Sequence, residues 1–597
     1  MRLGVLLSSA VCAIVLASGV SSSTQTPAQQ RNGRSLAVVG ATLIDGQGGA
    51  PIRDAVVVAR AGKFVSAGSR ASVSVPADAE VIHAEGKYII PGLIDGHVHY
   101  RTYLGELCLN YGVTTVFDLG NVSEWMMLLK EGIANGAITR IPNLYSSGWI
   151  LEVPPPPGGG GGVKRGATFR VGVNGPDAAR KLVAKMLDEQ GMDYIKVFQG
   201  LPPDTLKAIS EEAHKRGKIV LGHTDDVYES VNSGLDAVTH VWGIAETTLS
   251  PEDAKLHKAG RLDTPYANMV PANVDKVVAF MIEHKTPDNP LLIYEHYPST
   301  DRAAQFRGET YEALGSADLG YITPDAKMAM LYQFDRVRSY QRRMGTFPFL
   351  DALTPQQVDA FKRGYRNAQD FVRKFTKAGG VVWVGTDTGG AAVVPGLAVH
   401  EEMQLLVDSG LTPMQALLAA TKVPAEIFGK QKEVGVIAPG RSADLLVLDA
   451  DPLRDISNTR KISSVILRGQ KVELGYHWNY TLPFVNPVET DDVTSEYLAV
   501  PKIERVEPLV VNQGAPTTLA LQGSGFSTRA QVMFNGSPVN TAFQSTTALS
   551  AEVPASLLSV AGTWNVTVVN PRPGGGQSNA LGLMVRSTTP ARAGGRQ

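Results

Sequence analysis

The central part of the chain alternates short apolar strands with amphipathic helical patterns, and this alternation restricts the fold more than any other feature. Helical patterns such as 177–189, 203–216 and 354–378 separate the strands. The eight strands are predicted at residues 92–97, 112–118, 141–148, 193–198, 218–223, 236–241, 290–294 and 381–386. Alternating strands and helices indicate βα units and a parallel sheet. Eight such units predict an α/β protein with a (β/α)8 barrel over residues 91–429, whose functional groups lie at the C-terminal strand ends.

Two irregular stretches interrupt the alternation. A proline run at 154–157 and a glycine run at 158–162 follow the third strand, and they predict a solvated flexible loop, with a mobile lid as the alternative. Residues 250–341 are longer than one βα unit requires. Their helical patterns predict an inserted helical layer beside the barrel mouth.

Short β patterns flank the barrel on both sides. Alternating β-branched residues with glycine turns cover residues 35–90, and a similar pattern returns after residue 430. We therefore expect residues 24–90 and 430–482 to form one composite β-sandwich domain from the two flanks of the barrel.

A second β unit follows a polar linker at 483–500. Residues 501–586 show period-two alternation, clearest at 563–569, and Asn535-Gly536 is a strong hairpin turn. This pattern predicts a separate all-β unit. The tail at 587–597 is expected to be disordered.

The N-terminus is typical of a secretory signal peptide, predicted at residues 1–23. Arg2 precedes an apolar run from Leu3 to Val20, which gives way to a Ser/Thr/Gln-rich segment. An uncleaved anchor helix is the alternative. Cleavage would remove Cys12 and leave Cys108 as the one cysteine, so no internal disulfide is expected. A secreted or periplasmic location follows from this prediction.

Composition gives no reason to expect a polyanionic partner. The 597 residues have a net charge of −1, with 43% hydrophobic and 19% charged residues. These values are typical of a globular chain of several domains. They give no reason to expect nucleic acid as a partner, or a membrane surface beyond the signal segment. An oligomer is compatible with the sequence.

The first barrel strand ends in a pattern typical of half a metal site. Asp95, His97 and His99 alternate at its end, so their side chains project to the same face. Two imidazoles at this spacing need further ligands from other strands.

Lys196 lies on the inner face of the fourth strand, because Ile195 and Val197 suit the helix-facing side. A charged, unpaired lysine inside a barrel is costly. It is expected either to pair with a carboxylate or to react with carbon dioxide, which gives an anionic carbamate that can bridge two cations.

Three further candidates follow later strands. His223 ends the fifth strand, His240 ends the sixth, and Asp387 follows the eighth within Gly385-Thr386-Asp387-Thr388. Each alone is compatible with hydrogen bonding or capping. Together with the first histidine pair they predict a metal site at the barrel mouth, with Asp387 as ligand and general base.

The order of these motifs resembles the metal-dependent amidohydrolase superfamily over about residues 35–475. The matching segments are PGLIDGHVH, GVTTVFDLG, DYIKVF, GHT, GLDAVTHV, GTDTGG and IAPGRSADLLVLD. Within the superfamily the chain is most similar to the imidazolonepropionase-like and prolidase-like branch, which has a carboxylated lysine on strand four.

The resemblance implies two divalent ions, expected to be Zn²⁺. His97, His99 and Asp387 would hold one ion and His223 and His240 the other, with CO2-modified Lys196 between them. It further implies hydrolysis of amide or peptide C–N bonds by water activated between the ions, with Asp387 as catalytic base. Small amides such as Xaa-Pro dipeptides or N-acyl amino acids are the expected substrates, followed by lactones and cyclic amides.

Departures from the family leave alternatives open. Mononuclear deaminases usually have a glutamate three residues after the fifth-strand histidine, where this chain has Asp226. A mononuclear deaminase is therefore the competing enzyme class. The Gly-Gly-His often found after the third strand is absent, so no substrate contacts are transferred. Tyr100, Arg101, Tyr194 and His400 are candidates for the pocket wall, although packing or capping suits each.

The C-terminal unit resembles a TIG (IPT) immunoglobulin-like domain through Ile503-Glu504-Arg505-Val506, Gly523-Ser524-Gly525-Phe526 and Asn535-Gly536. This resemblance implies a spacer or a surface that contacts protein or glycan. A non-catalytic secreted binding protein is the remaining alternative. A non-catalytic protein would have no reason to retain all six candidate ligands.

Overall fold

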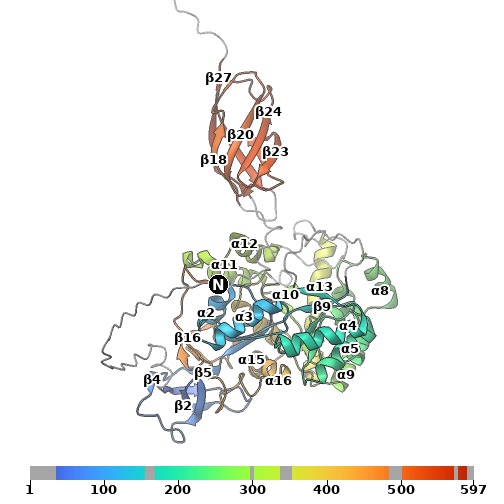
Figure 1. The fold of residues 1–597 in the computed structure, drawn as a ribbon, viewed down its shortest axis with the longest axis vertical. Helices are drawn as coiled ribbons and strands as arrows, with labels where there is room; N and C mark the ends of the chain where they lie inside the picture. The colour runs from blue at the N-terminus through green and yellow to red at the C-terminus, as the bar shows by residue number, and fades with distance from the viewer. Residues whose placement is uncertain are drawn as a thin grey trace, which may run out of the picture.

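The fold is described from a computed structural model, for residues 35–154, 169–295, 301–335, 353–390, 392–482, 500–570 and 576–587. The expected signal peptide, the Pro/Gly run beyond residue 154, nearly all of the linker and the tail beyond residue 587 lie outside these ranges. The described chain forms a barrel with a β domain attached below it, and a separate β unit (Figure 1).

The barrel is built from parallel strands in two runs. One sheet has the order β6-β7-β8 and the other β10-β9-β11-β12-β13-β14. The strands are β6 (Leu93–Val98), β7 (Val113–Asp118), β8 (Asn143–Ser146), β9 (Ile150–Glu152), β10 (Arg170–Gly172), β11 (Ile195–Val197), β12 (Val220–Gly222), β13 (Ala237–Thr239) and β14 (Asp288–Asn289). Parallel bridges join Asp288 to Val382 and Val98 to Thr388. Residues 382–388 therefore lie between β14 and β6 as the eighth strand, and the predicted barrel class is confirmed.

The seventh strand was predicted at the wrong place. It comprises only Asp288 and Asn289, while the apolar run after it forms the one-turn helix α10 (Leu292–Glu295). Leu291 has a φ of 52°, which ends the extended chain. Four apolar residues in a row fit a buried strand and a buried helical turn equally well, because every side of either is covered.

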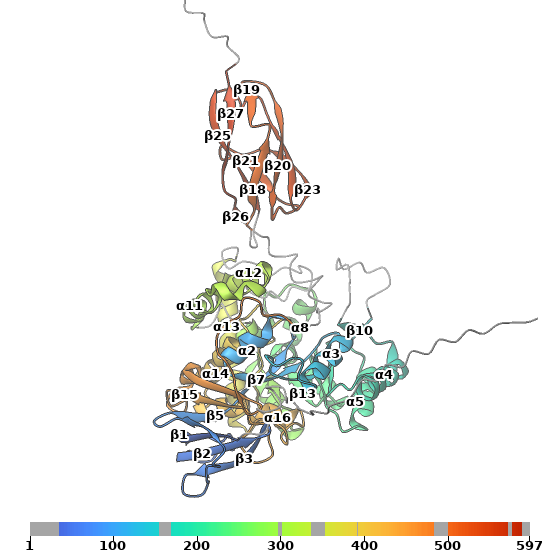
Figure 2. The ribbon, with the colours of Figure 1, turned by 60° about the vertical axis from the view of Figure 1, so that its left-hand side comes forward.

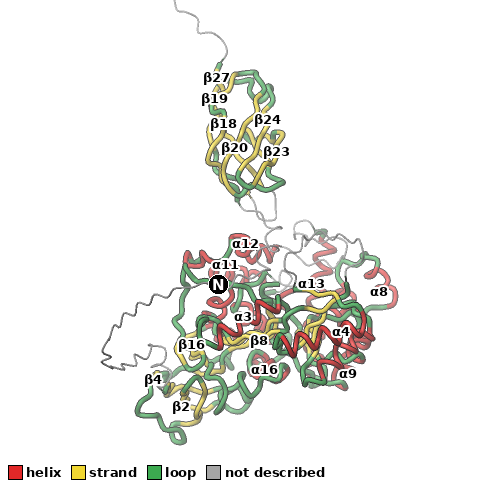
Figure 3. Tube along the Cα trace, viewed as in Figure 1, coloured by secondary structure: helices red, strands yellow, loops and turns green. Residues whose placement is uncertain are grey.

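Helices surround the barrel strands (Figure 3). They are α2 (Leu104–Asn110), α3 (Ser123–Ala134), α4 (Gly175–Ala184), α5 (Pro203–His214), α6 (Val227–Asn232), α7 (Trp242–Thr247), α8 (Pro251–Lys258), α9 (Pro271–Glu283), α11 (Ala303–Leu314), α12 (Pro324–Tyr332), α13 (Pro355–Lys377), α14 (Leu397–Asp408), α15 (Pro413–Ala419) and α16 (Lys422–Ile427). The longest, α13, begins with a capping box between Thr354 and Gln357. Phe361, Tyr365 and Phe375 lie on its buried face.

The two flanks of the barrel form a single eight-stranded sheet of order β17-β16-β15-β5-β1-β2-β3, with β4 paired to β1. The strands are β1 (Leu36–Leu43), β2 (Ile52–Arg60), β3 (Lys63–Ser69), β4 (Glu80–His83), β5 (Tyr88–Pro91), β15 (Leu445–Leu448), β16 (Ile462–Leu467) and β17 (Gln470–Lys471). Antiparallel β15 pairs with β5, placing Leu445 opposite Pro91. The chain thus leaves this sheet directly into β6.

The C-terminal unit has two sheets in which most strand pairs are antiparallel (Figure 2). It also has its own apolar core. Its strands are β18 (Lys502–Glu507), β19 (Val510–Asn512), β20 (Thr517–Ser524), β21 (Gln531–Phe534), β22 (Ser537–Pro538), β23 (Asn540–Ser545), β24 (Ala548–Val553), β25 (Gly562–Asn570), β26 (Gly576–Gln577) and β27 (Leu581–Arg586). Val566 and Val568 are buried as the alternation predicted. In the described part of the chain, no helix is long and apolar enough to cross a bilayer.

Candidate metal centre

Four imidazoles lie next to one another at the C-terminal ends of the barrel strands. His97 and His99 come from the end of β6, and His223 and His240 directly follow β12 and β13. The ring centroids of His99 and His97 are 5.7 Å apart, those of His97 and His240 5.4 Å, and those of His240 and His223 4.4 Å. The four predicted histidines therefore form a continuous row across the barrel mouth.

The Asp387 carboxylate faces this row. Its Oδ1 lies 3.0 Å from His99 Nε2 and 3.6 Å from His97 Nε2, and its Oδ2 lies 3.9 Å from His240 Nε2. Candidate ligand atoms of His97, His240 and Asp387 all lie within 4.8 Å of one another. Burial favours the protonated carboxyl, but the adjacent histidines outweigh it and hold the pKa of Asp387 below its usual value.

The outer ring nitrogens of the first two histidines are held by acceptors. His97 Nδ1 lies 2.9 Å from Asn289 Oδ1, and His99 Nδ1 lies 2.9 Å from the carbonyl oxygen of Gly120. Each acceptor requires N–H at Nδ1 and so directs the Nε2 lone pair into the site. His97 Nε2 is buried and makes no hydrogen bond. This is the orientation that a metal ligand requires.

Lys196 extends into the barrel beside the histidines. It is fully buried on β11, and its Nζ donates to Thr239 Oγ1 at 2.8 Å. Burial lowers the pKa of Lys196 to about 7, despite the opposing effect of Asp387. Burial, together with the charge of Lys196, also lowers the pKa of His97, and burial and the neighbouring His240 lower that of His223. Neutral imidazoles and a neutral amine are the forms that bind metal or react with CO2.

Two of the candidate ligands have backbone conformations that non-glycine residues rarely adopt. The φ angle is 68° at His240 and 55° at Asp387. Such strain is concentrated at functional sites, where the surrounding structure must enforce it. At His240 the backbone N–H donates to the Asn289 carbonyl at 2.8 Å, and at Asp387 it donates to the His97 carbonyl at 2.7 Å.

Asp95, which precedes the first two candidate ligands, joins the first barrel strand to the eighth. Its carboxylate accepts hydrogen bonds from Thr386 Oγ1 at 2.6 Å, from Thr386 N at 3.1 Å and from His97 N at 3.2 Å. Burial raises the pKa of Asp95 to about 7. Its bonds thus fix the strand ends from which His97 and Asp387 project.

The loop after Asp387 approaches the first strand too closely for any side chain. A Cβ at Gly389 would lie 1.9 Å from the carbonyl oxygen of His99, and Gly389 has a φ of 88°. A Cβ at Gly390 would lie 2.7 Å from Asp387 Oδ1. The Gly-Gly pair after Asp387 therefore lets this loop close over the histidines.

Aromatic side chains that the sequence did not single out line the metal centre. Phe169 contacts the His99 ring at 5.9 Å, Phe198 the His223 ring at 4.5 Å, and Tyr294 the His240 ring at 5.2 Å between centroids. The Arg170 guanidinium lies 4.1 Å above the Phe198 ring and pairs with Glu152 at 3.1 Å. Phe198 could be found from the sequence as the residue after β11. Arg170 begins β10, a strand outside the predicted eight, and Phe169 directly precedes it.

Most of the suggested pocket-wall residues serve the fold instead. Tyr194 is buried and donates to the carbonyl oxygen of Asp118. Both ring nitrogens of His400 are bonded, to Thr459 and to the carbonyl oxygen of Tyr111. Tyr100 is also buried. Arg101 is only 4% exposed and lies against the Gly389 position.

Asp226, the residue that kept deamination open, caps α6. Its carboxylate accepts a hydrogen bond from Glu229 N at 3.0 Å. This is the ordinary use of aspartate at an N-cap. The cap holds the side chain at the start of the helix.

The donor set fits divalent metal ions. Four histidines, one carboxylate and a lysine able to form a carbamate are the ligand types that zinc and similar ions accept. The strongest structural evidence is His97, whose buried Nε2 is oriented inward by Asn289 and has no hydrogen-bond partner. Buried polar atoms in proteins normally have a hydrogen-bond partner, so a buried nitrogen without one indicates a place for a ligand such as a metal ion.

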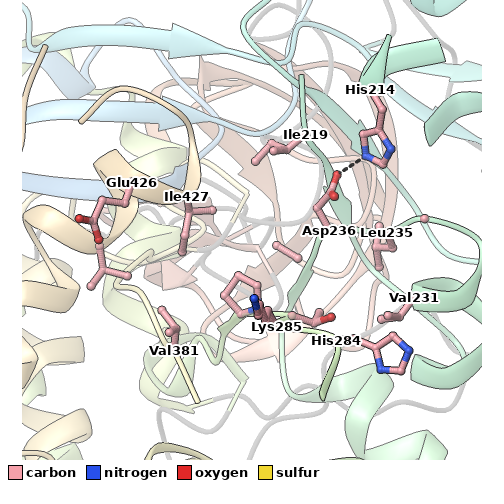
Figure 4. A pocket seen from close by; sticks show the side chains of 15 residues that line it. His214, Ile219, Val231, Leu235, Asp236, His284, Lys285, Val381, Glu426 and Ile427 are labelled. Carbon is pink, nitrogen blue, oxygen red and sulfur yellow. Dashed lines mark hydrogen bonds and ion pairs between the residues drawn. The ribbon is translucent and has the colours of Figure 1, made fainter. Parts of the chain in front are cut away.

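A separate cavity of about 540 Å³ opens at the other end of the barrel (Figure 4). Its lining includes Ile219, Asp236 and Pro287, which directly precede β12, β13 and β14. His214 Nε2 and Asp236 Oδ2 are 2.8 Å apart in its wall. The cavity lies at the N-terminal strand ends and is therefore distinct from the histidine site.

Comparison with known proteins decides the family. The amidohydrolase family model matches residues 106–472, which include Lys196, His223, His240 and Asp387. The chain belongs to the amidohydrolase family. A second match, to the IPT/TIG domain, covers residues 501–583. Both predicted resemblances are confirmed, and the family agrees with the prediction of an enzyme.

Individual relatives are distant. An adenine deaminase from Bacillus licheniformis is 26% identical over 336 residues, which are 52% of this chain and 53% of the relative. A dihydroorotase from Anaeromyxobacter dehalogenans is 24% identical over 432 residues, 70% of this chain and 88% of the relative. The crystal structure of a putative prolidase from Bifidobacterium longum has a TM-score of 0.52 at 24% identity and covers 74% of this chain and 96% of its own. The chain thus spans about half the length of the adenine deaminase.

Proposed function

We propose that this amidohydrolase is a metal-dependent hydrolase of amide C–N bonds in small substrates. The observation that supports it best is the meeting of six side chains at one end of the barrel, namely His97, His99, His223, His240, Lys196 and Asp387. Xaa-Pro dipeptides and N-acyl amino acids are the proposed substrates. The similarity to a prolidase fold is compatible with them but does not identify them.

The site residues have separate tasks in this proposal. When bound, divalent ions supply Lewis acidity, which polarises a carbonyl group and makes water a stronger acid. The four imidazoles bind through neutral nitrogens. Asp387 accepts the proton of the attacking water and delivers it to the leaving nitrogen. Its lowered pKa keeps the carboxylate ionised at neutral pH.

Lys196 is proposed to act as a carbamate. Its neutral Nζ adds to the carbon of CO2, an N–C bond forms and one proton is released. The product carries one negative charge shared by two oxygens, and these oxygens would be suitable ligands for two divalent ions, so we propose a binuclear site and expect zinc. The buried position of Nζ, close to Thr239, protects such a group from bulk water.

A mononuclear deaminase is the second candidate, because adenine deaminases are among the relatives. The position of Asp226 counts against it. A proton shuttle needs a carboxylate that is free to reach the reacting atoms, and this one caps α6.

A substrate screen tests the proposal. Purified protein, loaded with zinc in the presence of bicarbonate, is incubated with dipeptides, N-acyl amino acids, lactones and adenine, with Asp387→Asn as the matched control. Cleavage of an amide, abolished in that variant, supports the hydrolase. Release of ammonia from adenine by protein with one metal per chain would establish the deaminase instead, and unchanged turnover in the variant would exclude Asp387 as the base.

We further propose that the chain is exported and that its TIG domain is a spacer or a contact surface for protein or glycan. N-terminal sequencing of the protein recovered from the extracellular or periplasmic fraction tests export. A mature N-terminus near residue 24 is expected, whereas an intact Met1 in a membrane pellet would indicate the anchor helix.

A further inference from the structure

We propose that Asn289 is a positioning residue that fixes the tautomer and orientation of His97 and thereby sets the affinity of the site for metal. The inference rests on the proposed metal centre and names a residue outside its ligand set. Asn289 is fully buried at the end of β14.

The amide group of Asn289 has both ends committed. Its Nδ2 donates to the carbonyl oxygen of Trp383 at 2.9 Å, and its Oδ1 lies 2.9 Å from His97 Nδ1. Because a carbonyl oxygen can only accept, the Trp383 bond determines which end of the amide is nitrogen. The oxygen must then face His97, so Nδ1 carries the proton and Nε2 retains its lone pair.

The tautomer of His97 would not be fixed by a serine or a leucine at position 289, nor by an amide that could rotate freely. A hydroxyl can donate as well as accept, so it would tolerate either tautomer of His97. The Trp383 carbonyl makes Asn289 a one-way acceptor. Holding one tautomer in advance removes the cost of selecting it when the metal binds.

Gly385 leaves the space for this contact because glycine has no side chain. A Cβ at Gly385 would lie 2.5 Å from His97 Cβ and 2.8 Å from Asn289 Oδ1. A methyl group there would push the imidazole and the amide apart. Gly385 therefore belongs to the same arrangement, although it touches no ligand atom.

The backbone of Asn289 serves a second histidine. Its carbonyl oxygen accepts the N–H of His240 at 2.8 Å, next to the positive φ of that residue. Substitution of the side chain leaves this backbone bond in place. An Asn289 variant therefore removes the bonds to His97 and Trp383 and leaves the His240 contact in place.

A purely structural role is the competing explanation, because Asn289 links β14 to the eighth strand. It predicts a loss of stability without a change in metal affinity. Asn143 supplies a matched control, since its Nδ2 also donates to a buried oxygen acceptor, the Asp444 carboxylate at 2.7 Å, but at the opposite ends of the strands.

The experiment measures zinc binding to metal-free protein by calorimetry and the visible spectrum of the cobalt-loaded protein. Asn289→Ala should weaken binding of the tightest ion about 10- to 100-fold and alter the cobalt spectrum. Asn289→Asp, which keeps an acceptor for Nδ1–H, should recover most of that affinity. Asn143→Ala should lower the melting temperature and leave both readouts unchanged.

Each outcome bears on the proposal. Folded Asn289→Ala with affinity within twofold of wild type would overturn it, as would equal losses in the Ala and Asp variants. If Asn289→Asp does not fold, Gly385→Ala replaces it and should reproduce the defect of Asn289→Ala. A wild-type protein that binds metal but cleaves no amide would refute the proposed function alone, whereas one that binds no divalent metal would refute both.

Discussion

Glu402 on α14 provides the sharpest test of the electrostatics of this barrel. Its side chain is fully buried, and its two carboxyl oxygens accept the backbone N–H groups of Leu292 at 3.1 Å and Ile293 at 2.7 Å. Burial raises the pKa of Glu402 from 4.5 to about 8, with a smaller contribution from Asp95, although the two backbone bonds oppose the rise. The group is therefore a neutral acid in the folded protein at pH 7.

The sign of the pH dependence follows from proton counting. Between pH 4.5 and about 8 the folded protein keeps this proton and the unfolded chain does not, so the free energy of unfolding falls as pH rises through that window. At about 1.4 kcal/mol per pH unit, the whole window corresponds to about 5 kcal/mol. Asp288 and Asp95 contribute in the same direction, because burial also raises their pKa.

The variant Glu402→Gln isolates the contribution of this group. Glutamine stays neutral at every pH, but its amide nitrogen cannot accept one of the two N–H bonds, which costs about 1 to 3 kcal/mol. Metal-free wild type and variant are melted from pH 5 to pH 8. The variant should be less stable at pH 5 and gain on the wild type by up to about 4 kcal/mol between pH 5 and pH 8, which corresponds to a shift on the order of 5 to 10 °C.

The comparison cancels the titration of groups that do not interact with Glu402, whereas Asp95 and Asp288 are electrostatically coupled to it. A difference in melting temperature that does not change with pH would refute the reasoning, since it would mean that Glu402 is ionised in the folded protein.

Four further outcomes are expected. Lys196→Met should reduce turnover at least about 100-fold, and ¹³C-bicarbonate should give a carbamate signal in wild type but not in this variant, measured by ¹³C NMR. Removal of metal with a chelator should abolish activity, and zinc should restore it, as followed by turnover and metal content. Gly389→Ala should lose at least about tenfold in zinc affinity, because its Cβ would meet the His99 carbonyl at 1.9 Å. Asp226→Ala should lose about 1 kcal/mol of stability and keep its turnover, whereas a loss of activity of about 100-fold would restore the deaminase reading.

The sequence was sufficient for the barrel class and for the meeting of the six candidate ligands. Ligands at strand ends are predictable because parallel strands bring their C-terminal ends to one face, wherever they lie in the chain. Their roles as metal ligands stay predictions. His97 and His99 stood out by their spacing, and His223 and His240 by their places after apolar strands.

The rest depends on contacts between distant segments. Asn289 acquires its importance from His97 and Trp383, which are 192 and 94 residues away. Its strand is two residues long, too short for any periodicity, and the apolar run behind it attracted the prediction instead. Phe169 and Arg170 were missed because β10 extends the sheet beyond the eight strands that the pattern predicts.

The composite sheet also dictates the order in which this protein can be assembled. Strand β5 receives its partner β15 only after the 353 residues from 92 to 444 have been synthesised, because Pro91 pairs with Leu445. Until then one edge of the first β segment stays open beside its apolar core. The sheet can therefore be completed only after the barrel segment has been synthesised. Such long-range pairing slows folding, and the open edge needs protection during synthesis.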